Sequence, residues 1–271
     1  MIRSSRVRVA LFTVLLGLFA WSCATVPITG RRQLNLVPDN QILGMASAQY
    51  DTVLMTSKLS TNKEQTAMIK RCGLRIQKAV ESYFQSKNQM GQLAGYEWEF
   101  NLIESKEVNA WCMPGGKVAF YTGIIPVCKD ETGIAVVMGH EVAHAVAKHG
   151  SERMSQGLLA QFGGAALDAA LANNSAATRQ LAMTAFGVGA QFGALLPFSR
   201  KQESEADQLG LIFMAMAGYD PRAAVPFWER MAAGGGQKPP EFMSTHPSDE
   251  TRIANLNRLM PEALTYYKPA N

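Results

Sequence analysis

Residues 140–144 read HEVAH, and this HExxH pattern constrains the chain more than any other stretch. Residues four apart on an α-helix lie one turn apart and about 40° around its axis, so His140 and His144 can reach one metal ion. Glu141 stands beside the first histidine, where it can point at a water molecule held by that metal. Two histidine ligands and a general base are the arrangement of zinc peptidases. The alternative interpretation is an ordinary buried helix that carries these residues by chance.

The neighbours of this motif predict a helix from Asp130 to His149, which Gly150 ends. Apolar residues lie on most sides of that helix, which is typical of a helix buried in a core. His149 is five residues beyond His144 and about 140° away around the axis, so it faces elsewhere. We therefore expect His149 to interact with the C-terminal dipole of the helix rather than with the metal.

A zinc peptidase needs a third protein ligand and an open fourth position for water. A later helix, which opens near Ser199, carries Glu203 and Asp207 four residues apart on its core-facing side. Glu203 is the expected third ligand. Asp207 can accept the other ring N–H of a ligand histidine, which fixes the tautomer of that histidine and raises its basicity. Glu205 lies about 160° from Asp207 around the helix and is expected on the solvated side.

The composition limits the possible functions. The chain has 271 residues, of which 47% are hydrophobic and 18% are charged, so it is too apolar for disorder. The net charge is +4, but Arg3, Arg6 and Arg8 belong to a leader without acidic residues. The rest of the chain has no basic patch interleaved with aromatic residues. Nucleic-acid binding therefore has no support in the sequence.

Residues 1–22 are predicted to be a signal peptide. The arginines are followed by an apolar run, residues 7–19, which is too short for a comfortable membrane span. The sequence AWSC that ends at Cys23 suggests a bacterial lipoprotein cleavage site, with Cys23 as the lipidated N-terminus. These features predict a lipoprotein of the bacterial periplasm, attached to the outer membrane. A plain secretory signal and an uncleaved anchor are the alternatives.

We expect residues 23–42 to form the lipid anchor and an extended tether, and residues 43–271 to form one zinc metallopeptidase domain. If Cys23 carries lipid, three cysteines remain, and at most one disulfide can form among them. Three buried, unpaired thiols are the alternative interpretation. The cysteines concerned are Cys72, Cys112 and Cys128.

Two helices are predicted at the start of the domain, residues 39–58 and 62–84, because each has an apolar stripe at helical spacing. Asp39 is the expected cap of the first. The period then changes to the alternation of half-buried strands. Three short strands are predicted, at residues 96–103, 109–112 and 116–122.

These strands predict a small sheet in a mostly helical body, that is, an α+β and mainly α fold. The functional interpretation is that an edge of this sheet, near Asn109 and Ala110, flanks the HExxH helix. A peptide substrate could add to that edge as another strand through main-chain hydrogen bonds. The alternative is that the sheet is core architecture only.

Residues 151–198 are rich in Ala, Gly, Leu and Phe, and a polar turn in the middle predicts a helical hairpin. Gln161, Asp168 and Gln191 interrupt its arms, so neither arm is a convincing membrane span. Two interpretations stay open. The arms could be core helices, or they could form a mobile lid or a membrane-facing cover over the cleft.

The last part of the chain predicts a helix up to about Met231, with a break or kink at Pro226, and a final helix that carries Arg252. Ser248 or Asp249 is expected to cap the final helix. His246 lies in the loop between the two helices. It could reach the zinc as a reversible fourth ligand, stabilise the oxyanion, or have no role.

Taken together, four motifs resemble those of the HtpX/BepA-like zinc metallopeptidases, which are of the gluzincin type. Residues 23–31 (CATVPITGR) resemble the start of the exported lipoprotein branch of that family. The resemblance implies a compact zincin domain that binds one zinc ion per chain. It implies His140, His144 and Glu203 as zinc ligands, Glu141 as base, Asp207 as partner of a ligand, and His246 near the metal. The four motifs are HExxH, Glu203-xxx-Asp207, Asn109-Ala110 before Pro114-Gly115-Gly116, and Thr245-His246-Pro247.

The resemblance further implies a metalloendopeptidase of the bacterial cell envelope that hydrolyses unfolded or misassembled proteins in outer-membrane quality control. In such an enzyme zinc lowers the pKa of its bound water, and Glu141 moves the proton from that water to the leaving amine. The outer-membrane assembly machinery is a possible partner. An alternative is a chaperone-like assembly factor whose metal site His246 keeps latent. A purely structural zinc site is disfavoured, because such sites usually use cysteine.

Overall fold

The structure of the protein is a computed structural model that describes residues 23–26, 29–234 and 249–269. The predicted signal peptide and His246 lie outside these residues, so the roles predicted for them stay predictions. The described part is mainly helical with a small sheet, which confirms the predicted fold class. The N-terminal elements are β1 (Cys23–Thr25), β2 (Arg32–Leu34), α2 (Asp39–Thr56), α3 (Lys63–Ser86), η1 (Met90–Leu93), β3 (Glu99–Ile103), β4 (Ala110–Met113), β5 (Lys117–Tyr121), η2 (Thr122–Ile124) and α4 (Ile125–Cys128). The remaining elements are α5 (Glu131–Val146), α6 (His149–Ala170), α7 (Ala176–Val188), η3 (Gly189–Leu195), α8 (Leu196–Met216), η4 (Pro221–Ala223), α9 (Ala224–Ala233) and α10 (Asp249–Tyr266).

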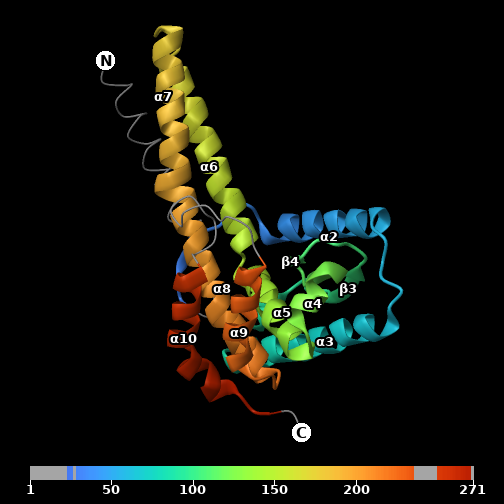
Figure 1. Ribbon diagram of the computed structural model, residues 1–271. Helices are drawn as coiled ribbons and strands as arrows, with labels where there is room; N and C mark the ends of the chain where they lie inside the picture. The colour runs from blue at the N-terminus through green and yellow to red at the C-terminus, as the bar shows by residue number, and fades with distance from the viewer. Residues whose placement is uncertain (1–22, 27–28, 235–248, 270–271) are drawn as a thin grey trace.

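The sheet has the order β3-β5-β4, so β4 is an edge strand within the described residues. β5 pairs in parallel with β3 and antiparallel with β4. In Figure 1 the sheet lies between α2 and α3, and β4 packs beside α5. The predicted strands and their position beside the HExxH helix are therefore confirmed, and Ala110 begins the edge strand.

Helices α5 and α8 form the centre of the core, and two glycines let their backbones approach closely. A Cβ atom on Gly139 would lie 2.7 Å from the carbonyl oxygen of Gly210. A Cβ atom on Gly210 would lie 2.9 Å from the amide nitrogen of His140. Both distances are shorter than side chains tolerate. Glycine at these two positions therefore sets how near α8 comes to the HExxH helix.

The predicted single helix from Asp130 to His149 is wrong at its end. α5 ends at Val146, and Lys148 adopts a left-handed conformation with φ of +57° before α6 begins at His149. The Lys148 ammonium donates to Oδ2 of Asp39 at 2.6 Å, which helps to hold this non-glycine residue in place. Asp39 therefore pairs with Lys148 and makes no capping hydrogen bond to α2. His149 starts a new helix, so it is not the partner of a helix C-terminus.

Pro226 causes no break, because it lies in the first turn of α9, where the backbone N–H groups have no partner within the helix. Cys72, Cys112 and Cys128 are free, and Cys72 and Cys128 are buried. The interpretation of these cysteines as unpaired thiols is thus the one that the structure supports.

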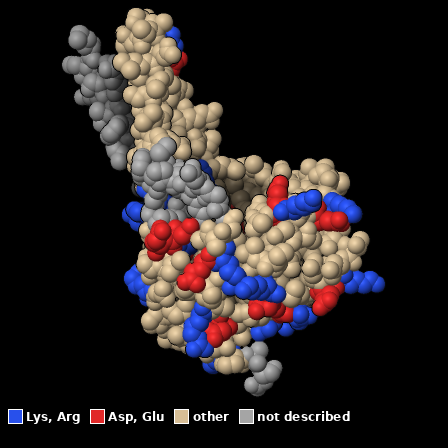
Figure 2. All heavy atoms as spheres, in the orientation of Figure 1, with Lys and Arg blue, Asp and Glu red and all other residues tan. Residues whose placement is uncertain are grey.

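The predicted helical hairpin is confirmed, and it projects from the body (Figure 1). No residue of α7 is buried, so the interpretation of this arm as a core helix is wrong. Residues Ala176–Met216 form one continuous run of α7, η3 and α8 that is long and apolar enough to cross a membrane by length and composition. Of the three polar residues that argued against a span, only Gln191 lies in this run. Figure 2 shows the projection as an almost uncharged surface.

Candidate metal centre

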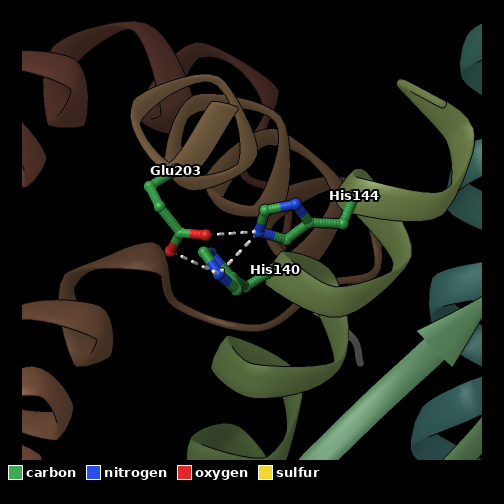
Figure 3. A group of neighbouring side chains, drawn as sticks. All are labelled: His140, His144 and Glu203. Carbon is green, nitrogen blue, oxygen red and sulfur yellow. Dashed lines mark hydrogen bonds and ion pairs between the residues drawn. The ribbon is translucent and has the colours of Figure 1, made fainter. Parts of the chain in front are cut away.

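Three side chains converge between α5 and α8 (Figure 3). The Nε2 atoms of His140 and His144 lie 3.1 Å apart. Oε1 of Glu203 lies 3.2 Å from Nε2 of His144, and its Oε2 lies 3.5 Å from Nε2 of His140. The structure thus brings together the three residues that the sequence predicted as ligands, from segments about sixty residues apart in the chain.

These distances fit one zinc ion. Ligand atoms about 2.0–2.1 Å from a tetrahedral zinc ion are separated by roughly 3.3 Å, and the three observed distances scatter around that value. The side chains of His140, His144 and Glu203 are only 7%, 11% and 8% exposed. A carboxylate at that depth needs a cation or donors to offset the loss of water. Two imidazoles and one carboxylate are also a donor set of catalytic zinc sites.

Burial lowers the pKa of both histidines, but the net shifts are opposite. For His144 burial dominates and lowers the pKa to about 3, although the hydrogen bond to Glu203 opposes this effect, so His144 is a neutral imidazole. Burial and the charge of Arg252 also lower the pKa of His140, but hydrogen bonds to Asp207 and Glu203 outweigh them and raise it to about 9. Metal binding at neutral pH must therefore displace a proton from His140.

Asp207 lies where the sequence predicted it. Its Oδ1 is 3.0 Å from Nδ1 of His140 and accepts a 2.6 Å hydrogen bond from the guanidinium of Arg252. Burial raises the pKa of Asp207, but the positive charge of Arg252 and the hydrogen bond from His140 lower it further than burial raises it. The guanidinium of Arg252 also stacks 3.4 Å above the ring of Trp228. Sequence reasoning gave no role to Arg252 or Trp228, because only the fold brings α9 and α10 to this side of His140.

Glu141 lies half-buried on α5, next to His140. Burial and then the negative charge of Glu141 raise the pKa of the Cys112 thiol on β4, so the carboxylate lies close to the edge strand. On the inner side of that strand, the carbonyl of Asn109 accepts a hydrogen bond from the amide of Tyr121 at 3.1 Å. The predicted substrate edge and the predicted base thus lie on the same side of α5.

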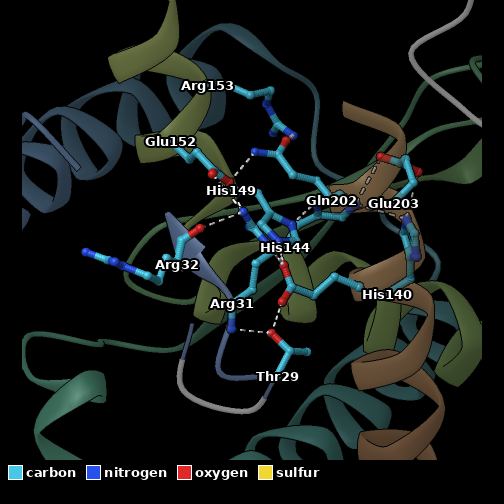
Figure 4. Close-up of polar contacts among 11 residues, drawn as sticks. Thr29, Arg31, Arg32, His140, His144, His149, Glu152, Arg153, Gln202 and Glu203 are labelled. Carbon is cyan, nitrogen blue, oxygen red and sulfur yellow. Dashed lines mark hydrogen bonds and ion pairs between the residues drawn. The ribbon is translucent and has the colours of Figure 1, made fainter. Parts of the chain in front are cut away.

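His149 and Glu205 have positions that the sequence did not predict, and Figure 4 shows His149 beside His144. Nδ1 of His149 lies 2.9 Å from Nδ1 of His144, and its Nε2 lies 3.0 Å from Oε2 of Glu205. His149 is fully buried, and burial lowers its pKa, although Glu205 opposes that effect. Glu205 is 6% exposed, so its expected place on the solvated side of α8 is wrong.

The N-terminal segment explains this burial. Arg31 donates through Nε to Oε2 of Glu205 at 2.8 Å and through its two terminal nitrogens to both carboxylate oxygens of Glu152, each at 2.8 Å. The hydroxyl of Thr29 donates to Oε1 of Glu205. The side of α8 that helical periodicity assigned to solvent is therefore covered by residues 29–34.

The sequence profile of Peptidase family M48 matches residues 73–260, which include the three predicted ligands, Glu141 and Asp207. The chain is 37% identical over 243 residues to "Mitochondrial metalloendopeptidase OMA1" of Schizosaccharomyces pombe, an alignment of 88% of this chain and 66% of that protein. It is 36% identical over 202 residues to the protein of the same name from Arabidopsis thaliana, covering 71% and 38% of the two chains. It is 30% identical over 163 residues to the "Beta-barrel assembly-enhancing protease" of Escherichia coli, covering 58% and 33%. The chain thus spans less than two thirds of the length of each relative.

These relatives contradict the predicted location in the bacterial periplasm at the outer membrane. Relatives from fungi, a plant and vertebrates are all named as mitochondrial metalloendopeptidases. The prediction depended on the arginines and the apolar run of the leader and on the AWSC sequence that ends at Cys23. A leader with arginine and without acidic residues is shared by export signals and mitochondrial transit peptides, so its composition does not identify the compartment.

Proposed function

The chain belongs to peptidase family M48, and we propose that it is a zinc metalloendopeptidase that cleaves unfolded or misassembled proteins next to a membrane. One observation supports this proposal above all. His140, His144 and Glu203 present three buried ligand atoms at the spacing of a tetrahedral zinc site, and Glu141, the proposed base, is adjacent to His140 on α5.

In this proposal, His140, His144 and Glu203 hold the zinc ion, which supplies Lewis-acid polarisation and a water molecule of lowered pKa. Glu141 accepts a proton from the attacking water and delivers it to the leaving amine. Asp207 fixes the tautomer of His140 by accepting from Nδ1, so that Nε2 is directed toward Glu203. Arg252 keeps Asp207 ionised for that task.

The edge strand β4 indicates the form of the substrate. Its outer side has no strand neighbour in the described part of the chain, and it lies near Glu141. A peptide that adds to this edge must be extended and must expose its main-chain groups. Folded proteins do not offer such segments, whereas unfolded or misassembled proteins do. Asn109 and Ala110 are the proposed start of the binding edge.

The hairpin of α6 and α7 supports the proposed position at a membrane. Between residues 154 and 199 the only charged side chains are Asp168 and Arg179, and they pair with each other at 2.6 Å. The base of the hairpin carries basic residues, including Arg153 and Lys201. An uncharged projection above a basic base is suited to acyl chains and anionic headgroups.

Cleavage of an unfolded protein by the full chain tests the peptidase activity. We expect zinc-dependent cleavage that is lost with a chelator and lost in Glu141→Gln, while Glu141→Gln still binds one zinc ion per chain. His246→Ala would cleave faster if His246 keeps the site latent. Zinc binding by the wild type without cleavage of any unfolded protein would overturn the peptidase proposal and favour the assembly-factor interpretation.

Flotation with anionic lipid vesicles tests the membrane contact. Leu181 on α7 is 72% exposed, and Leu74 on α3 is 53% exposed and distant from the hairpin. We expect Leu181→Glu to reduce flotation and Leu74→Glu to leave it unchanged. Equal flotation of the two variants would contradict the assignment of the hairpin to a bilayer.

A further inference from the structure

A continuous line of buried and partly buried hydrogen bonds joins the metal centre to the N-terminal segment. It runs from His144 to His149, from His149 to Glu205, and from Glu205 to Arg31. The three distances are 2.9, 3.0 and 2.8 Å, so each is an ordinary hydrogen bond. Arg31 is 174 residues from Glu205 in sequence.

The direction of these bonds follows from the chemistry of imidazole. Nε2 of His144 faces Glu203 and His140, so a metal ion takes its lone pair there and the ring proton of neutral His144 must sit on Nδ1. That N–H donates to Nδ1 of His149, which must be unprotonated to accept it. The proton of His149 is then on Nε2 and donates to Glu205. With this arrangement of protons, each ring nitrogen of His144 and His149 that faces the line, and the Glu205 carboxylate, has a hydrogen-bond partner.

We propose that His149, Glu205 and Arg31 are positioning residues that hold His144 in the orientation and tautomer that the zinc site requires. This inference depends on the proposed role of His144 as a zinc ligand. A ligand histidine whose second nitrogen donates to a fixed acceptor is a better and more rigidly oriented ligand. Here a second histidine stands between the ligand and the carboxylate.

In this relay of His144, His149, Glu205 and Arg31, Arg31 is the only cation among the described residues that donates to both Glu205 and Glu152. Glu152 and Glu205 are 1% and 6% exposed, and Arg31 donates to both of them. Without its guanidinium, the two buried carboxylates would lose three charge-assisted hydrogen bonds, each of 2.8 Å. Glu205 would then be held less firmly in the position where it accepts from the N–H of His149. Thr29 and Gln202 contribute neutral hydrogen bonds only.

The same contacts fasten the base of the hairpin. Glu152 lies on α6, and Gln202 on α8 donates to its Oε2 at 2.7 Å. The amide of Leu36, which follows β2, donates to the hydroxyl of Ser155 on α6 at 2.9 Å. Residues 29–36 therefore connect the metal ligand to α6 and α8 at the base of the hairpin, and they form a structural part of the metal centre and not merely a tether.

Zinc affinity of the full chain, measured by competition with a chelator, tests the relay without relying on catalysis. We expect Arg31→Met and His149→Phe to weaken zinc binding by about 10- to 100-fold. His149→Asn keeps an acceptor oxygen near the place of Nδ1, so it should recover part of the loss. In the cobalt-substituted protein, the d–d absorption bands of Arg31→Met and His149→Phe should shift.

A matched control separates positioning from stability. Arg71 donates to Glu131 far from the metal, so Arg71→Met removes an arginine–glutamate pair of similar chemistry. It should lower the melting temperature without changing zinc affinity or the cobalt spectrum. If Arg31→Met does not fold, Glu205→Gln, which keeps the shape but removes the charge, provides the same comparison.

Variants of the relay that fold and bind zinc and cobalt as the wild type does would overturn the relay, even if the wild type cleaves. A wild type that binds zinc but does not cleave would instead overturn the peptidase proposal, and the affinity measurements would still decide on the relay.

Discussion

Replacing Gly210 by alanine should disturb the metal centre without touching any proposed ligand. The new Cβ atom would lie 2.9 Å from the amide nitrogen and 3.0 Å from the Cα atom of His140. Ordinary contacts of this kind begin at 3.4 Å, so α8 must move by roughly half an ångström away from α5. Both close atoms belong to the backbone, which cannot rotate aside as a side chain does.

The size of the effect follows from the ligand distances. Glu203 on α8 lies 3.2 and 3.5 Å from the two histidine nitrogens on α5. A movement of half an ångström would bring these distances to roughly 3.7–4.0 Å, beyond the separation of roughly 3.3 Å between two ligand atoms of a tetrahedral zinc site. We expect zinc affinity to fall at least about tenfold, which is about 1.4 kcal/mol. Overpacking should also destabilise the metal-free fold by about 1–3 kcal/mol.

The assay is chelator competition for zinc together with thermal unfolding of the metal-free protein. Gly157→Ala on α6 is the matched control, because a Cβ atom there meets nothing within 4 Å. That control should keep its zinc affinity, and the better helix propensity of alanine can raise its stability by up to about 1 kcal/mol. Wild-type zinc affinity in a folded Gly210→Ala variant would refute the reasoning that the glycine contact sets the ligand distances.

Three further predictions follow from the protonation and packing of named residues. The pKa of His140 is raised to about 9, so below that pH its proton competes with zinc. Zinc affinity should therefore rise by roughly tenfold from pH 7 to pH 8. A zinc affinity that does not change with pH in chelator competition would contradict this prediction. Trp228→Ala removes the ring under Arg252 and should lower zinc affinity severalfold. Trp228→Phe keeps an aromatic ring and should retain most of the zinc affinity. Similar losses of zinc affinity in the two variants would contradict the stacking role. Burial raises the pKa of Glu131, but hydrogen bonds from Arg71 and Tyr219 lower it below its ordinary value. The stability that Glu131 contributes is therefore present above its unfolded pKa and lost as the pH falls through its folded pKa. Glu131→Gln should flatten the acidic side of the plot of melting temperature against pH. An unchanged acidic side would contradict the pairing of Glu131.

The sequence alone determined the local chemistry of the centre. The spacing of His140 and His144 and that of Glu203 and Asp207 follow from the period of one α-helix, so each pair was correctly placed on one face. The same local reasoning found the strands of the sheet and the helical hairpin, because alternation and apolar runs depend on neighbours in the chain. The prediction that the helix of His140 and His144 lies beside the helix of Glu203 required a second argument, namely that a zinc site needs a third protein ligand.

Tertiary structure alone decided what covers each helix. Periodicity assigned Glu205 to solvent, but residues 29–34 lie over that side of α8 and bury it against Arg31. The break at Lys148, which turns His149 toward His144, is held by Asp39 more than a hundred residues away. Arg252 reaches Asp207 from the last helix in the same way. Helical periodicity reports only which side of an element is apolar, whereas a buried charge becomes stable through partners that the fold brings from distant segments.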